Sequence, residues 1–257
     1  MENNEIPIGF IDSGVGGISV LKEAVKLLPM ENYIYFGDSK NAPYGTKDVK
    51  DVQQLTFNAC ELLMSYNVKA LVIACNTATS AAINEVREKY KFLPVIGIEP
   101  ALKPAVELDR KGKIIIMATP MTLVEKKFNK LMLNYEKVAE IISLPCPGLV
   151  ELIEKGIIEG DELEDYIRTR FSSLIEDDIA AVVLGCTHYP FIKKQLLKLL
   201  GEDTPILDGS IGTVKQLRKQ LDKLGMLNSR EGRGKIEILN SLDCPELISL
   251  SYKLFNL

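Results

Sequence analysis

The strongest constraint on the fold is an alternation of short apolar runs with segments of helical spacing. Apolar runs typical of strands cover residues 6–12, 32–38, 69–75 and 93–99. Segments with helical spacing lie between them, over residues 17–29, 50–66 and 80–90. Nearly continuous apolar strands that alternate with helices are typical of a parallel sheet covered on both faces. The first hundred residues therefore predict an α/β domain.

The same alternation starts again near residue 112. Strands are expected at 112–119, 138–147 and 179–186, and helices at 122–135 and 163–178. The chain thus predicts two α/β domains, each with a mostly parallel sheet flanked by helices. Pro and Gly cluster in 97–104 and 201–210, where we expect the chain to cross between the domains.

The spacing of polar strand ends suggests that the two halves are related by pseudo-twofold symmetry. From Asp12 to Cys75 there are 63 positions, and from Thr119 to Cys186 there are 67. Each interval joins the end of a first strand to a cysteine that ends a later strand. We therefore expect pseudo-symmetric domains with an active site in the cleft between them. A helical segment at 211–225 is expected to return to the first domain, which gives domains of 1–97 plus 208–257 and of 98–207.

Composition limits the class of protein. Hydrophobic residues make up 46% and charged residues 26%, as in a soluble globular protein. A net charge of -4 without a long basic block argues against nucleic acid as a partner. The apolar runs are too short to span a membrane, and the acidic, polar start "MENNEIP" does not resemble a signal peptide. A cytoplasmic protein is expected.

Five cysteines and one histidine limit the chemistry that the chain can support. The cysteine count is odd and no CxxC pair occurs, so reduced thiols are expected rather than a disulfide framework. A metal site is not expected, because few ligands are available. The cysteines are Cys60, Cys75, Cys146, Cys186 and Cys244.

Polar side chains gather where predicted strands end, which is where open α/β sheets bind small molecules. The clusters are Asp12-Ser13, Asp38, Cys75-Asn76-Thr77, Thr119 and Cys186-Thr187-His188. The glycine-rich stretch "DSGVGG" at 12–17 joins a strand to a helix. It matches neither a full dinucleotide fingerprint nor a Walker motif. Its interpretations are a tight turn, a cradle for a substrate carboxylate, or a site for a nucleotide phosphate.

The two strand-end cysteines allow several uses. Cys75 directly precedes a predicted helix, whose N-terminus would lower the thiol pKa from about 8.5, and the same argument applies to Cys186. Cys75 could instead be an inert buried thiol, and His188 could be structural. Two reactive thiols could form a disulfide, or one could act as a nucleophile. They could also serve as acid and base on opposite faces of one carbon, as inversion of a stereocentre requires.

Four segments resemble the signature blocks of the glutamate racemase family in order and spacing. They are "GFIDSGVGGISVLKE", "YFGDSKNAPYG", "ACNTAT" and "GCTHYP", and the resemblance covers nearly the whole chain. It implies a racemase that interconverts L- and D-glutamate without pyridoxal phosphate, metal or other cofactor. In bacteria D-glutamate feeds peptidoglycan synthesis. The resemblance also implies two pseudo-symmetric domains with the site between them.

The resemblance also implies roles for individual residues. Cys75 would take the α-proton from D-glutamate and Cys186 from L-glutamate, with Asp12 assisting Cys75 and His188 assisting Cys186. Two further acidic residues match positions implicated in the site, Asp38 and Glu154. Besides Asp12 and His188, the positions that match the substrate pocket are Ser13, Pro43, Tyr44, Gly45, Asn76, Thr77, Thr119, Thr122 and Thr187.

Three residues depart from the family pattern. Asn41 and Ala42 stand where many members carry Arg and a different small residue, and Glu151 stands where proline is common. The alternatives are a racemase for aspartate or another acidic amino acid, an amino-acid-binding protein without turnover, and a thiol hydrolase. The sequence leaves open whether the chain forms a homodimer and whether a cell-wall precursor activates it.

Overall fold

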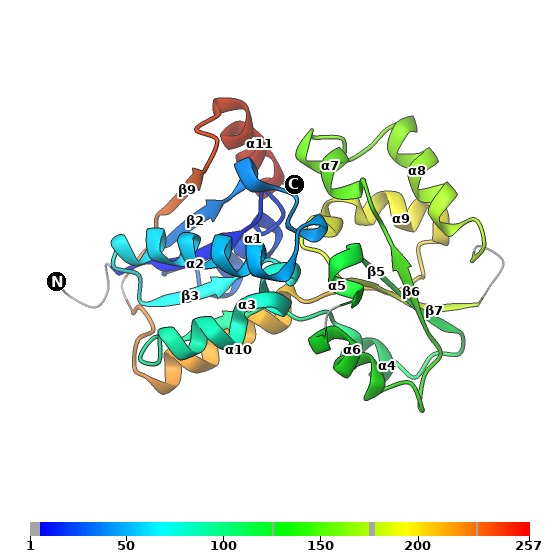
Figure 1. Cartoon of the computed structure of the whole chain (residues 1–257), viewed down its shortest axis with the longest axis horizontal. Helices are drawn as coiled ribbons and strands as arrows, with labels where there is room; N and C mark the ends of the chain where they lie inside the picture. Colours follow the sequence, from blue (N-terminus) through cyan, green and yellow to red (C-terminus); the bar gives the residue numbers. More distant parts are fainter. Residues whose placement is uncertain (1–5, 125, 175–177, 230) are drawn as a thin grey trace.

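The computed structural model describes residues 6–124, 126–174, 178–229 and 231–257. Figure 1 shows two sheets side by side, each with its own helices. The strand order is β4-β3-β1-β2-β9 in one sheet and β6-β5-β7-β8 in the other, and the strand pairs are parallel. The predicted fold of two α/β domains with parallel sheets is therefore confirmed.

The first sheet and its helices take residues from both ends of the chain. Its strands are β1 (Ile8–Asp12), β2 (Tyr33–Gly37), β3 (Ala70–Ile73), β4 (Val95–Gly97) and β9 (Ile236–Asn240). Its helices are α1 (Ile18–Leu27), α2 (Val49–Ser65), α3 (Asn76–Lys89), α10 (Ser210–Lys223) and α11 (Pro245–Phe255). Two short 3-10 helices are η1 (Ser39–Asn41) and η2 (Tyr44–Thr46).

The second sheet is formed from the middle of the chain. Its strands are β5 (Lys113–Ala118), β6 (Ile141–Pro145), β7 (Ile179–Leu184) and β8 (Ile206–Asp208). The helices around it are α4 (Leu102–Glu107), α5 (Pro120–Val124), α6 (Lys126–Leu133), α7 (Leu149–Glu154), α8 (Asp161–Phe171) and α9 (Lys193–Leu200). The 3-10 helix η3 (Tyr189–Ile192) leads into α9.

The strand order confirms the pseudo-symmetry. The order β4-β3-β1-β2 in the first sheet corresponds to β8-β7-β5-β6 in the second. Asp12 ends β1, and Thr119 directly follows β5. Cys75 lies two residues beyond the end of β3, and Cys186 lies two residues beyond the end of β7. Equivalent strands therefore present the two cysteines at equivalent places, as their spacing in the sequence predicts.

The strands of the first sheet are buried on both faces, which explains their continuous apolar pattern. Phe10 packs into a core that includes Leu21 of α1 and Leu217 of α10. The next residue, Ile11, packs on the opposite face with Leu63 of α2 and other residues of α2 and α3. Successive side chains of a strand point to opposite faces, so a strand between two helix layers must be apolar throughout.

Some elements differ from the predictions. The segment 201–210, expected to be only a crossover, contains β8, and the C-terminal tail contains β9 and α11 besides the expected helix. β8 has only three residues and only one of the five residues of β9 is buried, so neither has a long apolar run. The helix expected at 163–178 ends earlier, as α8, and residues 175–177 lie outside the described part. The exact domain limits stay a prediction.

An ion pair lies buried at the edge of the first domain. Lys69, just before β3, places Nζ 2.6 Å from Glu31 Oε2 and donates to the backbone oxygen of Met226 at 2.7 Å. Glu31 Oε1 accepts the backbone N–H of Asn228 at 2.8 Å. The pair therefore joins the residues before β2 and β3 to the loop that follows α10.

We expect Lys69→Met to lower the free energy of unfolding by about 3–5 kcal/mol, because it leaves the Glu31 carboxylate buried without its counter-charge. The matched control is Lys89→Met, since the pair of Lys89 with Glu61 is exposed, with side chains 43% and 60% accessible. That control should cost no more than about 1 kcal/mol. Urea unfolding of the two variants measures the difference, and equal losses would contradict a structural role for the buried pair.

Candidate functional site

The carboxyl ends of the strands in the two halves meet at one interface. Thr187, after β7, donates from Oγ1 to Asp12 Oδ2 at 2.9 Å. Thr77, after β3, lies with Oγ1 3.2 Å from Thr119 Oγ1 and 3.1 Å from Thr122 Oγ1. All five residues are buried. Polar clusters far apart in the sequence are thus brought together between the two sheets.

Cys75 is the N-cap residue of α3, and its side chain is 5% exposed. Its sulfur accepts the backbone N–H of Ala78 at 3.4 Å and lies 3.7 Å from Ser13 Oγ. Burial raises the pKa of the Cys75 thiol to about 12, and the negative charges of Asp12 and Cys186 act in the same direction. The predicted lowering of this pKa is therefore wrong, because burial and adjacent anions outweigh the helix N-terminus.

Cys186 occupies the equivalent place in the second half, with 8% of its side chain exposed. A 3-10 helix follows it before α9 begins at Lys193, so Cys186 does not cap an α-helix as Cys75 does. The helix argument made for Cys186 from the sequence is therefore wrong. Its sulfur instead lies 3.7 Å from His188 Nδ1.

His188 links Cys186 to a partly buried carboxylate. Its Nε2 lies 2.6 Å from Glu154 Oε1. Burial opposes the charge of the ring, but the interactions with Cys186 and Glu154 prevail and raise the pKa of His188 well above its usual value. Burial likewise opposes the charge of Glu154, and the hydrogen bond from His188 prevails and lowers the pKa of that carboxyl. Cys186, His188 and Glu154 thus lie in one series of polar contacts that joins the thiol to the carboxylate.

The glycine-rich loop at 12–17 binds carboxylates of the protein itself. The backbone N–H of Gly14 donates to Asp12 Oδ1 at 2.9 Å, and that of Val15 donates to Glu154 Oε1 at 2.7 Å. These two N–H groups are therefore occupied, contrary to a cradle that uses them for a substrate carboxylate. A Cβ at Gly14 would collide with Glu154, and one at Gly16 would collide with His188. Side chains from the other half require glycine at both positions.

Asp12 is fully buried between the halves. Burial raises the pKa of its carboxyl, although the positive charge of His188 and the hydrogen bonds from Gly14 and Thr187 oppose that effect. Its charge in turn raises the pKa of Cys75. The structure thus places Asp12 within electrostatic reach of Cys75, and its predicted assistance to that thiol stays a prediction.

Asp38 holds the segment that follows β2. Its Oδ2 accepts the hydroxyl of Tyr44 at 2.7 Å, and both of its oxygens accept Nδ2 of Asn41. Asn41, which departs from the family pattern, therefore contributes directly to this contact. Pro43 follows a cis peptide bond, and Gly45 lies so close to Thr119 that a Cβ would collide with it. The predicted catalytic role of Asp38 stays a prediction.

Unused hydrogen-bonding capacity lies beside Cys75. Oδ1 of Asn76 is buried and has no hydrogen-bond partner within the described residues. The three hydroxyls of Thr77, Thr119 and Thr122 bond to one another at 2.9–3.2 Å. Buried polar groups are normally satisfied, so the unpaired amide oxygen of Asn76 indicates a place for a ligand that donates a hydrogen bond.

Sequence reasoning missed three polar residues of the interface. Ser39 donates to Glu154 Oε2 at 3.3 Å, Ser19 donates to the backbone oxygen of Thr187 at 2.8 Å, and Tyr35 donates to that of Gly14 at 2.6 Å. Ser39 adjoins Asp38, and Ser19 is a serine in an apolar helical run, which are weak signals. The partners of all three come from distant or non-adjacent segments, which no local pattern encodes.

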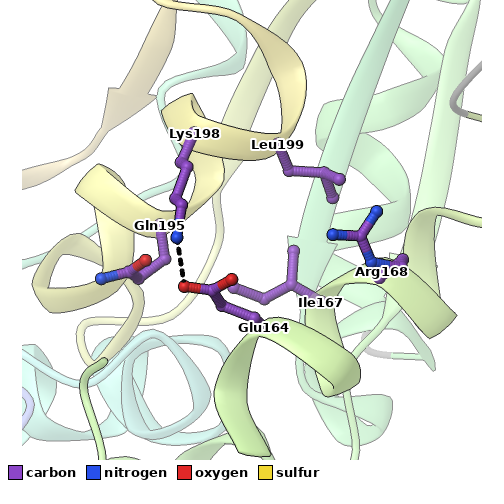
Figure 2. A pocket seen from close by; sticks show the side chains of 6 residues that line it. All are labelled: Glu164, Ile167, Arg168, Gln195, Lys198 and Leu199. Carbon is purple, nitrogen blue, oxygen red and sulfur yellow. Dashed lines mark hydrogen bonds and ion pairs between the residues drawn. The ribbon is translucent and has the colours of Figure 1, made fainter. Parts of the chain in front are cut away.

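The pocket in Figure 2 lies away from this interface. It has a volume of about 250 Å³ and lies between α8 and α9, where Glu164 and Lys198 form an ion pair of 2.6 Å. None of its lining residues belongs to the strand-end clusters. Within the described ranges, no group of three or more His, Cys, Asp or Glu side chains could hold a metal, and no helix is long and apolar enough to cross a membrane.

Comparison with known proteins gives consistent matches over the whole chain. Residues 8–217 match the family model described as Asp/Glu/hydantoin racemase. A glutamate racemase of Clostridium acetobutylicum is 64% identical over 257 residues, which cover 100% of this chain and 99% of that protein. One from Clostridium novyi is 60% identical over 258 residues, with 100% of both chains covered.

Solved structures show the same similarity. The glutamate racemase of Francisella tularensis in complex with D-glutamate superposes with a TM-score of 0.84 at 31% identity, covering 99% of this chain and 95% of that one. The Escherichia coli glutamate racemase, in complex with L-glutamate and an activator, superposes with a TM-score of 0.85 at 27% identity, covering 97% and 95%.

Proposed function

This chain belongs to the Asp/Glu/hydantoin racemase family, and we propose that it is an isomerase that interconverts L-glutamate and D-glutamate without a cofactor. Full-length identity of 64% to a glutamate racemase supports glutamate as the substrate. The observation that carries the chemistry is the equivalent placement of Cys75 and Cys186 beyond β3 and β7. The D-glutamate formed would supply peptidoglycan synthesis.

Inversion at the α-carbon requires a base on one face and an acid on the other. With L-glutamate, the Cys186 thiolate beside cationic His188 takes the α-proton, so that the C–H bond breaks and an S–H bond forms. The Cys75 thiol, which its raised pKa keeps protonated, then gives its proton to the opposite face of the same carbon. From D-glutamate the two cysteines exchange roles. No electron or group other than a proton is transferred.

The α-proton of an amino acid is very weakly acidic, so the carbanionic transition state needs stabilisation. The buried Oδ1 of Asn76, which has no partner within the described residues, is suited to accept from the substrate ammonium group, and the hydroxyl of Thr77 is suited to donate to a substrate carboxylate. Preorganised dipoles in a site without water act most strongly on developing charge. Because both thiols are nearly buried, substrate binding requires the two halves to move apart.

The cellular compartment and the oligomeric state are also proposals. Both cysteines must remain reduced for this mechanism, which fits the cytoplasm as the compartment. A homodimer is the assembly that sedimentation equilibrium of the purified protein would test. The nearest alternative activity is racemisation of aspartate or another acidic amino acid, and a binding protein without turnover is the alternative from a different class.

The test is circular dichroism of the purified protein with each L-amino acid. We expect the signal of L-glutamate to decay to zero, while L-aspartate reacts far more slowly. Activity should survive dialysis against a chelator, and the protein should show no pyridoxal absorbance. Preference for aspartate, absence of turnover, or loss of activity on chelation that a divalent metal restores would each contradict the proposal.

A further inference from the structure

Tyr35 is a buried tyrosine whose hydroxyl reaches the glycine-rich loop. It lies in β2 with 1% of its surface exposed, and its hydroxyl donates to the backbone oxygen of Gly14 at 2.6 Å. Burial raises the pKa of Tyr35 well above its usual value, and the charges of Asp12 and Glu154 add to that effect. The hydroxyl therefore stays protonated and remains a donor to this carbonyl.

The carbonyl of Gly14 and the N–H of Val15 belong to one peptide group. That N–H donates to Glu154 Oε1 at 2.7 Å, so Tyr35 and Glu154 bind opposite edges of the same rigid plane. Peptides next to glycine rotate easily, since glycine populates a wide range of backbone conformations. An external hydrogen bond is therefore needed to hold this peptide with its N–H towards Glu154.

The hydrogen bonds continue from Glu154 to a reactive thiol. The same Oε1 lies 2.6 Å from His188 Nε2, and His188 Nδ1 lies 3.7 Å from Cys186 Sγ. The Val15 N–H and His188 thus bond to the same carboxylate oxygen, so the direction of the Gly14–Val15 peptide helps to fix the position of the oxygen that pairs with His188. A group at one end of such a chain can influence the charge at the other end.

We propose that Tyr35 is a positioning residue for Cys186, acting from the first domain through the Gly14–Val15 peptide, Glu154 and His188. The inference rests on the proposed function, in which Cys186 is a base. Tyr35 touches neither substrate nor thiol in this scheme. It fixes the direction of the N–H group that orients the Glu154 carboxylate, and so sustains the positive charge of His188 beside the sulfur.

The test variant is Tyr35→Phe, and the chain offers a matched control in Tyr33→Phe. Tyr33 lies two residues earlier on the same face of β2, is 2% exposed, and donates to the backbone oxygens of Ala24 and Leu28. Each variant removes one buried tyrosyl hydroxyl and keeps the ring. Their losses in unfolding free energy should therefore be similar, which separates stability from positioning.

Two readouts distinguish the variants. We expect Tyr35→Phe to lower kcat about 10-fold with little change in KM, the size of effect expected from one lost hydrogen bond, while Tyr33→Phe keeps wild-type kinetics. The second readout is the rate of Cys186 alkylation by iodoacetamide, measured across pH by peptide mass spectrometry. The midpoint of its pH profile should shift to higher pH in Tyr35→Phe only. This second readout needs no turnover, so it tests the positioning even if the proposed activity fails.

A double-mutant cycle completes the experiment. Glu154→Gln should shift Cys186 alkylation in the same direction and at least as far, and adding Tyr35→Phe to it should shift the profile no further, because Tyr35 acts through Glu154. Additive shifts would overturn the proposal. So would identical kinetics and identical Cys186 alkylation profiles in Tyr35→Phe and Tyr33→Phe.

Discussion

Replacement of either strand-end cysteine by alanine is expected to abolish racemisation while the protein stays folded. Removal of the acid or the base leaves one face of the α-carbon without a proton donor or acceptor. A positioned acid–base group contributes about 10²–10⁴-fold to rate, and Cys75→Ala or Cys186→Ala should lose at least the upper part of that range. The measurement is kcat by circular dichroism from each enantiomer.

The chain supplies a matched control for this experiment. Cys60, in α2, is fully buried, and burial raises its pKa to about 12, as for Cys75. It packs in the core rather than at the interface. Cys60→Ala should therefore lose stability without losing turnover. Retention of more than a few per cent of wild-type activity in either Cys75→Ala or Cys186→Ala would exclude the two-thiol mechanism.

The second large effect concerns the groups beside each thiol. We expect His188→Asn to lower kcat mainly from L-glutamate, because His188 contacts Cys186. Asp12→Asn should lower kcat mainly from D-glutamate, because the negative charge of Asp12 raises the pKa of Cys75 and so makes its thiolate a stronger base. Each loss should be about 10²-fold or more in the affected direction. The measurement is kcat in both directions with α-protiated and α-deuterated substrates.

The equilibrium constant between the two enantiomers is one, so any loss in kcat/KM must be equal in both directions. The inequality can therefore be seen only in kcat and KM taken separately, or in the isotope effects. Equal kcat losses and identical isotope effects would make His188 and Asp12 shared residues of the pocket. The charge of Asp12 contributes to the raised pKa of Cys75, so Asp12→Asn should also move alkylation of Cys75 to lower pH.

The sequence predicts the architecture well where strands are buried on both faces. The continuous apolar runs that form β1, β3, β5 and β7 place four strand ends, and the nearly equal spacing of the polar residues there predicts the pseudo-symmetry. Short strands are harder to predict, since β8 has three residues and only one of the five residues of β9 is buried. Neither offers enough buried positions to show a period.

The electrostatics of the site could not be predicted from local sequence. A helix N-terminus suggests a low thiol pKa at Cys75, but the structure buries that thiol beside Asp12, which the chain places 63 positions earlier. The glycine-rich loop receives Glu154 from 139 positions away. Both effects depend on which strand ends meet, so they follow from the packing of the two domains and not from any one motif.

The most direct test of the central claim is the location of deuterium at the earliest times of reaction in heavy water. With L-glutamate, Cys186 removes the α-proton and solvent-exchanged Cys75 delivers a deuteron to the opposite face. We therefore expect the first D-glutamate formed to carry deuterium at the α-carbon, while the recovered L-glutamate still carries protium. Starting from D-glutamate, the first L-glutamate formed should carry deuterium, while the recovered D-glutamate still carries protium. Equal deuterium in product and recovered substrate at early times, or protium retained in the product, would contradict two cysteines on opposite faces.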